Sequence, residues 1–170
     1  GIALPVTLNA DGSQLAVAGS TAAVILLYTV DTGAMCRLIG HLAQITTLAF
    51  SPDGRQLASG SMDATVRLWD TASGDPHAVL RGHVQDVTCL AYAPGGRSLA
   101  SMGNFEAVRL WNLETATEVA TLPQPHAANW LAFSPDGRWL AVTQGDPAER
   151  ASAELERVII LPTGPDQPED

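Results

Sequence analysis

Short runs of apolar residues, each bounded by turn-forming residues, recur along the whole chain. A typical boundary is the turn Pro52-Asp53-Gly54. Proline presets the backbone of a turn, aspartate accepts a hydrogen bond from its own turn, and glycine adopts a positive φ without strain. Such runs, with turn signals about every 8–12 residues, predict β-strands. In the middle of the chain we expect strands at residues 45–50, 56–61, 65–69 and 77–80, and we expect a helical period at most over residues 148–157.

This succession of strands and turns repeats four times, as independent motifs show. A turn segment that ends in Leu-Ala recurs at a nearly constant spacing and begins at Asn9, Ser51, Ala93 and Ser134. Two further motifs share this period: a histidine follows Gly40, Gly82 and Pro125, and Val-Arg-Leu-Trp begins at Val66 and Val108. A fixed period of about 40–45 residues with four strands each is the signature of a propeller blade. We therefore predict an all-β fold of four-stranded antiparallel blades.

The motifs also carry a family resemblance. The combination of Gly-His, Ser-Pro-Asp-Gly-Arg-x-Leu-Ala and Val-Arg-Leu-Trp-Asp resembles the WD-repeat β-propellers over about residues 2–164. That resemblance implies part of a ring of seven or eight blades, closed by the remaining blades of a parent protein or by a second copy. The expected blades cover about residues 1–40, 41–81, 82–123 and 124–161, followed by an acidic, proline-rich tail or the start of a next segment at 162–170.

In this family, a histidine, a serine or threonine, an aspartate and a tryptophan form a hydrogen-bonded chain within one blade. In the second repeat the resemblance assigns these roles to His41, to Ser59 or Ser61, to Asp63 and to Trp69. Both serines point to the same side of their strand because side chains alternate with a period of two. The sequence therefore leaves the choice between them open.

The other repeats depart from this pattern. The third keeps His83, Ser101 and Trp111, but Asn104-Phe105 replaces the aspartate turn. The first has Leu27 at the tryptophan position, and the fourth has Leu161 there, after a connection about nine residues longer. We expect these losses to lower the stability of single blades but not to change the fold, since neighbouring blades share stability.

Charge and composition exclude several classes of function. The net charge is −9, with nine arginines and no lysine, whereas a nucleic-acid-binding surface is basic. No apolar run approaches the roughly 18 residues of a membrane span, and no signal peptide is evident at residue 1. Two cysteines, Cys36 and Cys89, do not make a disulfide framework, so we expect a reducing, cytoplasmic location.

The chemistry-bearing residues do not form a catalytic motif. The histidines His41, His83 and His126 lie on separate predicted blades, so we expect no metal site. The sequence contains no nucleophile elbow, His-Glu-x-x-His motif, phosphate loop or Cys-x-x-Cys pair. We therefore expect no enzyme activity and no cofactor.

A rigid ring that presents many loops favours a protein-interaction or sensing scaffold, with other proteins or peptides as partners and no role for nucleic acid or membrane. Two alternatives are an accessory propeller of an enzyme or signalling protein whose catalytic domain lies elsewhere, and a self-assembling structural propeller. Phe105 is expected either to anchor a partner or to pack on the neighbouring blade. The predicted partner face consists of Gln44, Met62, Gln85, Asp86, Asn104, Phe105 and Asn129.

Overall fold

The computed structural model describes residues 4–19, 23–122, 128–144 and 157–162, and its strands form four antiparallel sheets in chain order. The first sheet contains β1 (Val6–Leu8), β2 (Gln14–Ala18), β3 (Val24–Thr29) and β4 (Met35–Ile39). The second contains β5 (Ile45–Phe50), β6 (Gln56–Ser61), β7 (Thr65–Asp70) and β8 (Pro76–Arg81). The third contains β9 (Val87–Tyr92), β10 (Ser98–Gly103), β11 (Val108–Asn112) and β12 (Thr117–Leu122). The fourth contains β13 (Ala128–Phe133), β14 (Trp139–Gln144) and β15 (Arg157–Pro162).

The strands follow the predicted pattern closely in the second sheet, where each observed end lies within one residue of the expected one. Pro162 was assigned to the tail, but it is the last residue of β15. The helical period considered for residues 148–157 lies outside the described residues, apart from Arg157, which begins β15.

The turn between the first two strands of a sheet shows why the repeated motif forms a hairpin. In the second sheet, Asp53 accepts hydrogen bonds from the Ser51 hydroxyl at 2.7 Å and from the Arg55 amide at 3.1 Å. Gly54 has a φ of 71°, a left-handed conformation that glycine adopts without a steric penalty. The sequence-local turn chemistry therefore determines this hairpin.

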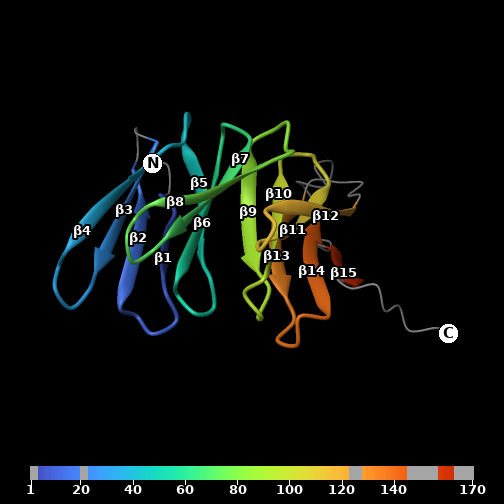
Figure 1. The fold of residues 1–170 in the computed structure, drawn as a ribbon. Helices are drawn as coiled ribbons and strands as arrows, with labels where there is room; N and C mark the ends of the chain where they lie inside the picture. Colours follow the sequence, from blue (N-terminus) through green and yellow to red (C-terminus); the bar gives the residue numbers. More distant parts are fainter. Residues whose placement is uncertain (1–3, 20–22, 123–127, 145–156, 163–170) are drawn as a thin grey trace, which may run out of the picture.

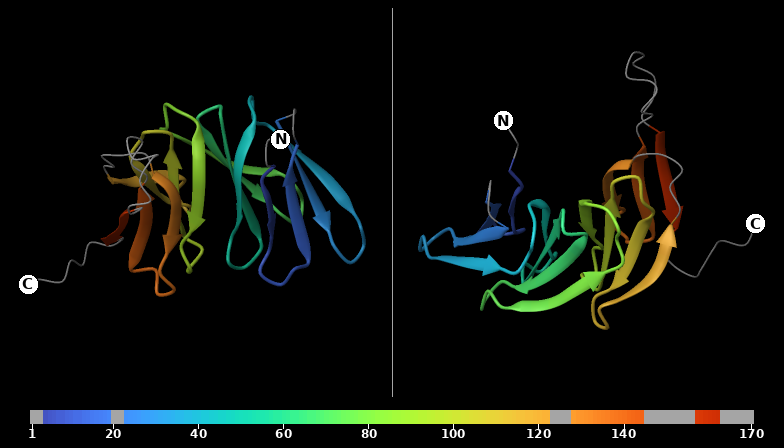
Figure 2. Two further views of the ribbon diagram at one scale, coloured as in Figure 1. Left: turned by 180° about the vertical axis from the view of Figure 1, so that it is seen from behind. Right: turned by 90° about the horizontal axis from the view of Figure 1, so that it is seen from above.

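The four sheets stand side by side in an arc (Figures 1 and 2). The first strands β1, β5, β9 and β13 lie along the concave side, and the fourth strands β4, β8 and β12 lie on the outside. In Figure 1 the hairpins between first and second strands lie along the lower edge of the arc. We call the opposite side the upper edge; it carries the β4–β5 and β8–β9 connections and the β6–β7 and β10–β11 turns.

The hydrophobic core lies in the three seams between neighbouring sheets. Leu27 and Leu38 of the first sheet pack with Leu57 and Trp69 of the second, and equivalent clusters fill the next two seams. Full burial of one such side chain stabilises the fold by about 1.5–3 kcal/mol. Each sheet therefore buries apolar side chains against its neighbours.

The strand register corrects one assignment in the first sheet. Trp69 lies opposite Leu57, and the residue opposite the equivalent Leu15 is Tyr28, not Leu27. The segment that joins this pair is one residue longer than its counterpart in the second sheet, so a constant repeat length places the tryptophan position one residue too early. In the fourth sheet Leu161 lies opposite Leu140, at the predicted position.

Candidate functional site on the upper edge

A chain of buried hydrogen bonds connects the core of the second sheet to the upper edge. The indole Nε1 of Trp69 donates to Oγ of Ser59 at 2.8 Å, and this hydroxyl lies 2.8 Å from Nε2 of His41. Nδ1 of His41 lies 2.8 Å from Oδ2 of Asp63. The structure thus places Ser59 between histidine and tryptophan. Ser61 donates instead to the carbonyl of Ala43 and accepts from the amide of Asp63, both at 3.1 Å.

The donors and acceptors of this chain assign its protons. An indole N–H can only donate and a carboxylate can only accept, so the Ser59 hydroxyl donates to Nε2 of His41, and Nδ1–H of His41 donates to Asp63. Burial lowers the pKa of His41, although the Asp63 carboxylate opposes this effect. Burial by itself raises the pKa of Asp63, but hydrogen bonds from Thr65, from the Leu42 amide and from His41 lower it to about 2. Asp63 is therefore ionised and His41 neutral at pH 7.

The third sheet contains the same chain with a different carboxylate. Trp111 Nε1 and His83 Nε2 each lie 2.7 Å from Oγ of Ser101, and His83 Nδ1 lies 2.6 Å from Oε2 of Glu106. Asn104-Phe105 does replace the aspartate turn, but the hydrogen-bonded chain keeps an acid because Glu106 bonds His83. The left-handed residue of the turn comes one position earlier than in the second sheet, at Phe105. The acid follows one residue later, and its longer side chain reaches His83.

Each carboxylate also holds the loop that follows its histidine. Oδ2 of Asp63 accepts from the amide of Leu42 at 2.9 Å, and Oε1 of Glu106 accepts from the amide of Val84 at 2.7 Å. The two residues held in this way are exposed: 88% of Leu42 and 77% of Val84 is accessible to solvent. The residue before each acid is exposed as well, with Met62 at 46% and Phe105 at 78%. We call these four side chains the upper-edge patch.

The predicted partner face agrees with this surface only in part. Met62, Gln85, Asn104 and Phe105 are exposed, whereas Gln44 and Asp86 are half-buried. The side chain of Asn129 lies outside the described residues. Sequence reasoning missed Leu42 and Val84, because it considered the two positions after them. The signal that could have identified them is an apolar residue directly after Gly-His, where a solvent-exposed loop begins.

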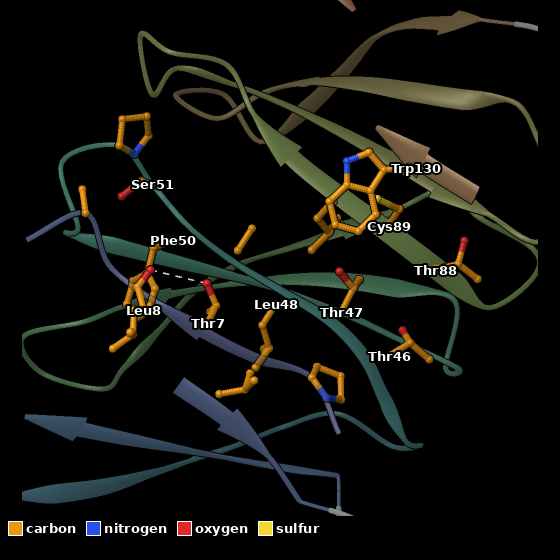
Figure 3. Close-up of a pocket in the computed structure, with 16 residues that line it drawn as sticks. Thr7, Leu8, Thr46, Thr47, Leu48, Phe50, Ser51, Thr88, Cys89 and Trp130 are labelled. Atoms are coloured by element: carbon orange, nitrogen blue, oxygen red, sulfur yellow. Dashed lines mark hydrogen bonds between the residues drawn. The ribbon is translucent and has the colours of Figure 1, made fainter. Parts of the chain in front are cut away.

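The concave side of the arc is an open depression of about 580 Å³ (Figure 3). It is lined by residues of β1, β5 and β9 and by Trp130, whose ring lies beside Cys89. Its described lining residues include no Asp, Glu, Arg or His. Burial raises the pKa of the Cys89 thiol, so this group is protonated at neutral pH. The depression therefore offers no pair of groups for acid–base chemistry.

Among the described residues, no group of three or more His, Cys, Asp and Glu side chains is arranged to hold a metal ion. His126 lies outside those residues. No helix within the described part of the chain is long and apolar enough to cross a membrane. Cys36 and Cys89 are both free thiols, and the cytoplasmic location stays a prediction.

Comparison with known families agrees with this geometry. The family model described as WD domain, G-beta repeat matches residues 34–70 and 74–103. The chain contains two WD40 repeats. Comparison with curated proteins found no match. WD40 repeats are typically non-catalytic and generally serve as protein-interaction scaffolds.

The matched WD40 repeats are offset from the sheets. Residues 34–70 contain β4 of the first sheet and β5 to β7 of the second, and residues 74–103 contain β8 and then β9 and β10. Each repeat therefore supplies the outer strand of one sheet and the inner strands of the next. Neighbouring sheets are interlocked by this arrangement, because one repeat hydrogen-bonds in two of them.

Proposed function

We propose that this WD40-repeat protein is a non-catalytic scaffold that binds another protein through its upper-edge patch. The observation that carries this proposal is that the upper-edge patch exposes four apolar side chains on two neighbouring sheets, namely Leu42, Met62, Val84 and Phe105. Single exposed apolar residues are common on protein surfaces, but a group of them on one side of the fold indicates an interaction site. The hydrogen bonds from Leu42 and Val84 to the buried carboxylates distinguish this group from ordinary surface residues.

Preorganisation supports the proposal energetically. The Asp63 carboxylate fixes the backbone of Leu42, and the Glu106 carboxylate fixes that of Val84, before any partner arrives. Ordering one residue of backbone costs roughly 1–2 kcal/mol, so loops that are already ordered lose less entropy on binding. The buried chains of hydrogen bonds thus serve the binding surface as well as the core.

Phe105 is the side chain best suited to anchor the partner. It is 78% exposed, so it does not pack on a neighbouring sheet, and its φ of 54° lies in the left-handed region. A bulky residue there costs about 1–3 kcal/mol, which the surrounding structure must offset. Exposed aromatic residues dominate the binding energy of many interfaces. The exposure of Phe105 is explained if this side chain contacts a partner.

Photo-crosslinking tests the proposal directly. A photoreactive amino acid replaces Phe105 in one variant and exposed Ala10, on the lower edge, in a control variant. We expect the Phe105 variant to capture a discrete partner protein and the Ala10 variant not to capture it. With that partner in hand, Leu42→Ser with Phe105→Ser should weaken its binding by about tenfold or more, as loss of about 1.4 kcal/mol implies. Capture of the same partner at both positions, or unchanged affinity of the double variant, refutes the proposal.

A second proposal concerns closure of the arc by further blades, from the same protein or from a second copy. Leu48 and Phe50 of β5 pack against the core of the first seam, but the equivalent Val6 and Leu8 of β1 are 62% and 57% exposed. In the first sheet these are positions that a preceding sheet would cover.

The fourth sheet has a matching apolar flank. Trp139 is 37% exposed and lines an open depression of about 530 Å³ with Phe133, Ser134 and Ala141. Gln14 of the first sheet occupies the position equivalent to Trp139. Its Nε2 donates a hydrogen bond to the carbonyl of Thr71, in the next sheet, at 3.1 Å. This position therefore reaches into the following seam, and Trp139 has the size and character to fill such a seam. Closure with seven or eight blades would cover both flanks.

A further inference from the structure

The arginines of β7 and β11 lie over the glycines that precede the two histidines. A Cβ atom added to Gly40 would lie 2.7 Å from Nη1 of Arg67, and one added to Gly82 would lie 3.0 Å from Nη1 of Arg109. Both distances are shorter than a Cβ atom allows without movement of its neighbour. The glycine of each Gly-His pair therefore makes room for a guanidinium group on the outer part of the seam.

The two guanidinium groups differ in their partners. Nη1 of Arg109 forms an ion pair with Glu118, which also accepts a hydrogen bond from Thr121. Burial by itself raises the pKa of Glu118, but these two hydrogen bonds lower it, so the carboxylate is ionised. The third sheet therefore neutralises its arginine internally.

The second sheet contains no such acid. Glu118 lies opposite Trp111, and the residue in the same register opposite Trp69 is Pro76. Within the described ranges, no carboxylate forms an ion pair or hydrogen bond with Arg67, and its Nε is buried without an acceptor. Nε of Arg109 is also buried without an acceptor, but Nη1 of Arg109 pairs with the Glu118 carboxylate.

A second positive charge lies close to Arg67. Arg81 is opposite Thr65, and Val79 is opposite Arg67, so both arginines are on the same face of neighbouring strands. Arg81 is exposed and forms no ion pair in the described part of the chain. On a protein with a net charge of −9, this outer corner of the second sheet is locally positive.

We propose that Arg67 binds a carboxylate supplied by an acidic segment of a partner protein, on the outer side of the seam between the first and second sheets. Arg109 and Glu118 show the geometry of the expected contact within the same molecule. The absence of a side chain at Gly40 leaves space for the guanidinium of Arg67, and Pro76 supplies no carboxylate at the acid position. This contact is separate from the upper-edge patch and does not depend on it.

The test uses residues 1–170 in the assembled state that they adopt in solution, the same for every variant, and a fluorescent hexaglutamate peptide, with binding followed by fluorescence anisotropy at low ionic strength. Arg67→Gln should weaken binding by about tenfold or more, because glutamine cannot form the charge-assisted hydrogen bonds that a guanidinium group forms with a carboxylate. Pro76→Glu should weaken binding to a similar degree, since the chain then supplies its own carboxylate. Pro76→Glu should also raise the thermal midpoint, which shows that the new acid reaches Arg67.

The matched control is Arg97→Gln, which also removes one positive charge. Arg97 lies in the turn between β9 and β10, on the lower edge and away from Arg67, so its loss should not alter peptide binding. Four results each overturn the proposal: no binding of hexaglutamate, equal binding of hexaglutamine, equal loss in the Arg97 and Arg67 variants, or competition by inorganic phosphate as strong as that by hexaglutamate. Crosslinking from Phe105 is unaffected by any of these results, so failure here is distinguishable from failure of the upper-edge proposal.

Discussion

Replacing Ser59 by alanine removes the hydroxyl that joins the tryptophan and the histidine of the second sheet. The hydroxyl lies 2.8 Å from Nε1 of Trp69 and 2.8 Å from Nε2 of His41. Ser59 is 0% exposed and Trp69 is 1% exposed, so water does not reach the groups that lose their partner. One unsatisfied buried polar group costs about 1–3 kcal/mol, and for two such groups we expect a loss of about 2–4 kcal/mol in the free energy of unfolding.

A double-mutant cycle separates the Ser59–Trp69 hydrogen bond from other effects of the substitution. Trp69→Phe removes the indole N–H and retains an aromatic ring. If the bond contributes as the structure indicates, Ser59→Ala should cost about 1 kcal/mol less in the Trp69→Phe background than in the original chain. Ser61 is the matched control on the same strand, because its hydroxyl forms hydrogen bonds with the backbone of Ala43 and Asp63 and not with Trp69. Ser61→Ala and Trp69→Phe should therefore be additive.

Chemical denaturation followed by far-ultraviolet circular dichroism provides the measurement, because the tryptophan substitution changes the fluorescence signal. All variants are compared at one protein concentration and in one assembly state, since assembly contributes to apparent stability. Additivity of Ser59→Ala with Trp69→Phe, or a loss below about 1 kcal/mol for Ser59→Ala alone, would refute the assigned role of Ser59.

Three further predictions follow from the same contacts. Acidification should lower the free energy of unfolding. The pKa values of His41 and His83 are below 6.5 in the folded state, so stability is lost as pH falls below about 6.5. The lowered pKa of Asp63 adds a further loss of stability between pH 3.8 and about 2. Denaturation at pH 7 and pH 5 checks this, and higher stability at pH 5 contradicts it. Glu106→Ala should cost about 1–3 kcal/mol and speed hydrogen exchange at the Val84 amide, whereas an unchanged exchange rate would mean that Glu106 does not hold this loop. Residues 1–170 alone should not form a soluble monomer, because Val6, Leu8 and Trp139 are exposed on the two flanks. Sedimentation tests this: a monodisperse 17.8 kDa species with cooperative unfolding contradicts closure by further blades.

Much of the fold could be predicted because its determinants are local in sequence. Turn residues such as Asp53 and Gly54 form their contacts within a few positions, so the hairpins between first and second strands were identifiable from short segments. The nearly constant spacing of these turn segments then showed that the same unit recurs. Strand limits in the second sheet agree with the prediction to within one residue for the same reason.

The errors arose where the prediction assumed a constant spacing. One additional residue before β3 places Tyr28, not Leu27, opposite Leu15. In the third sheet a left-handed Phe105 shifts the acid to Glu106, which a fixed offset from Asp63 does not find. Short connections accommodate one residue more or less without disturbing the strands, so spacing alone does not determine which side chains meet.

The sequence by itself determined the period, the strands and the residue types available for a buried hydrogen-bonded chain. Only the tertiary structure decided between Ser59 and Ser61, because both lie on one side of β6 and the choice depends on where His41 enters from the preceding connection. It also decided that Leu42 and Val84 are exposed, since exposure depends on how the upper-edge loops of neighbouring sheets lie together. Strands and turns follow from interactions between near residues, whereas a binding surface is formed by residues that are distant in sequence and become neighbours only when the sheets pack.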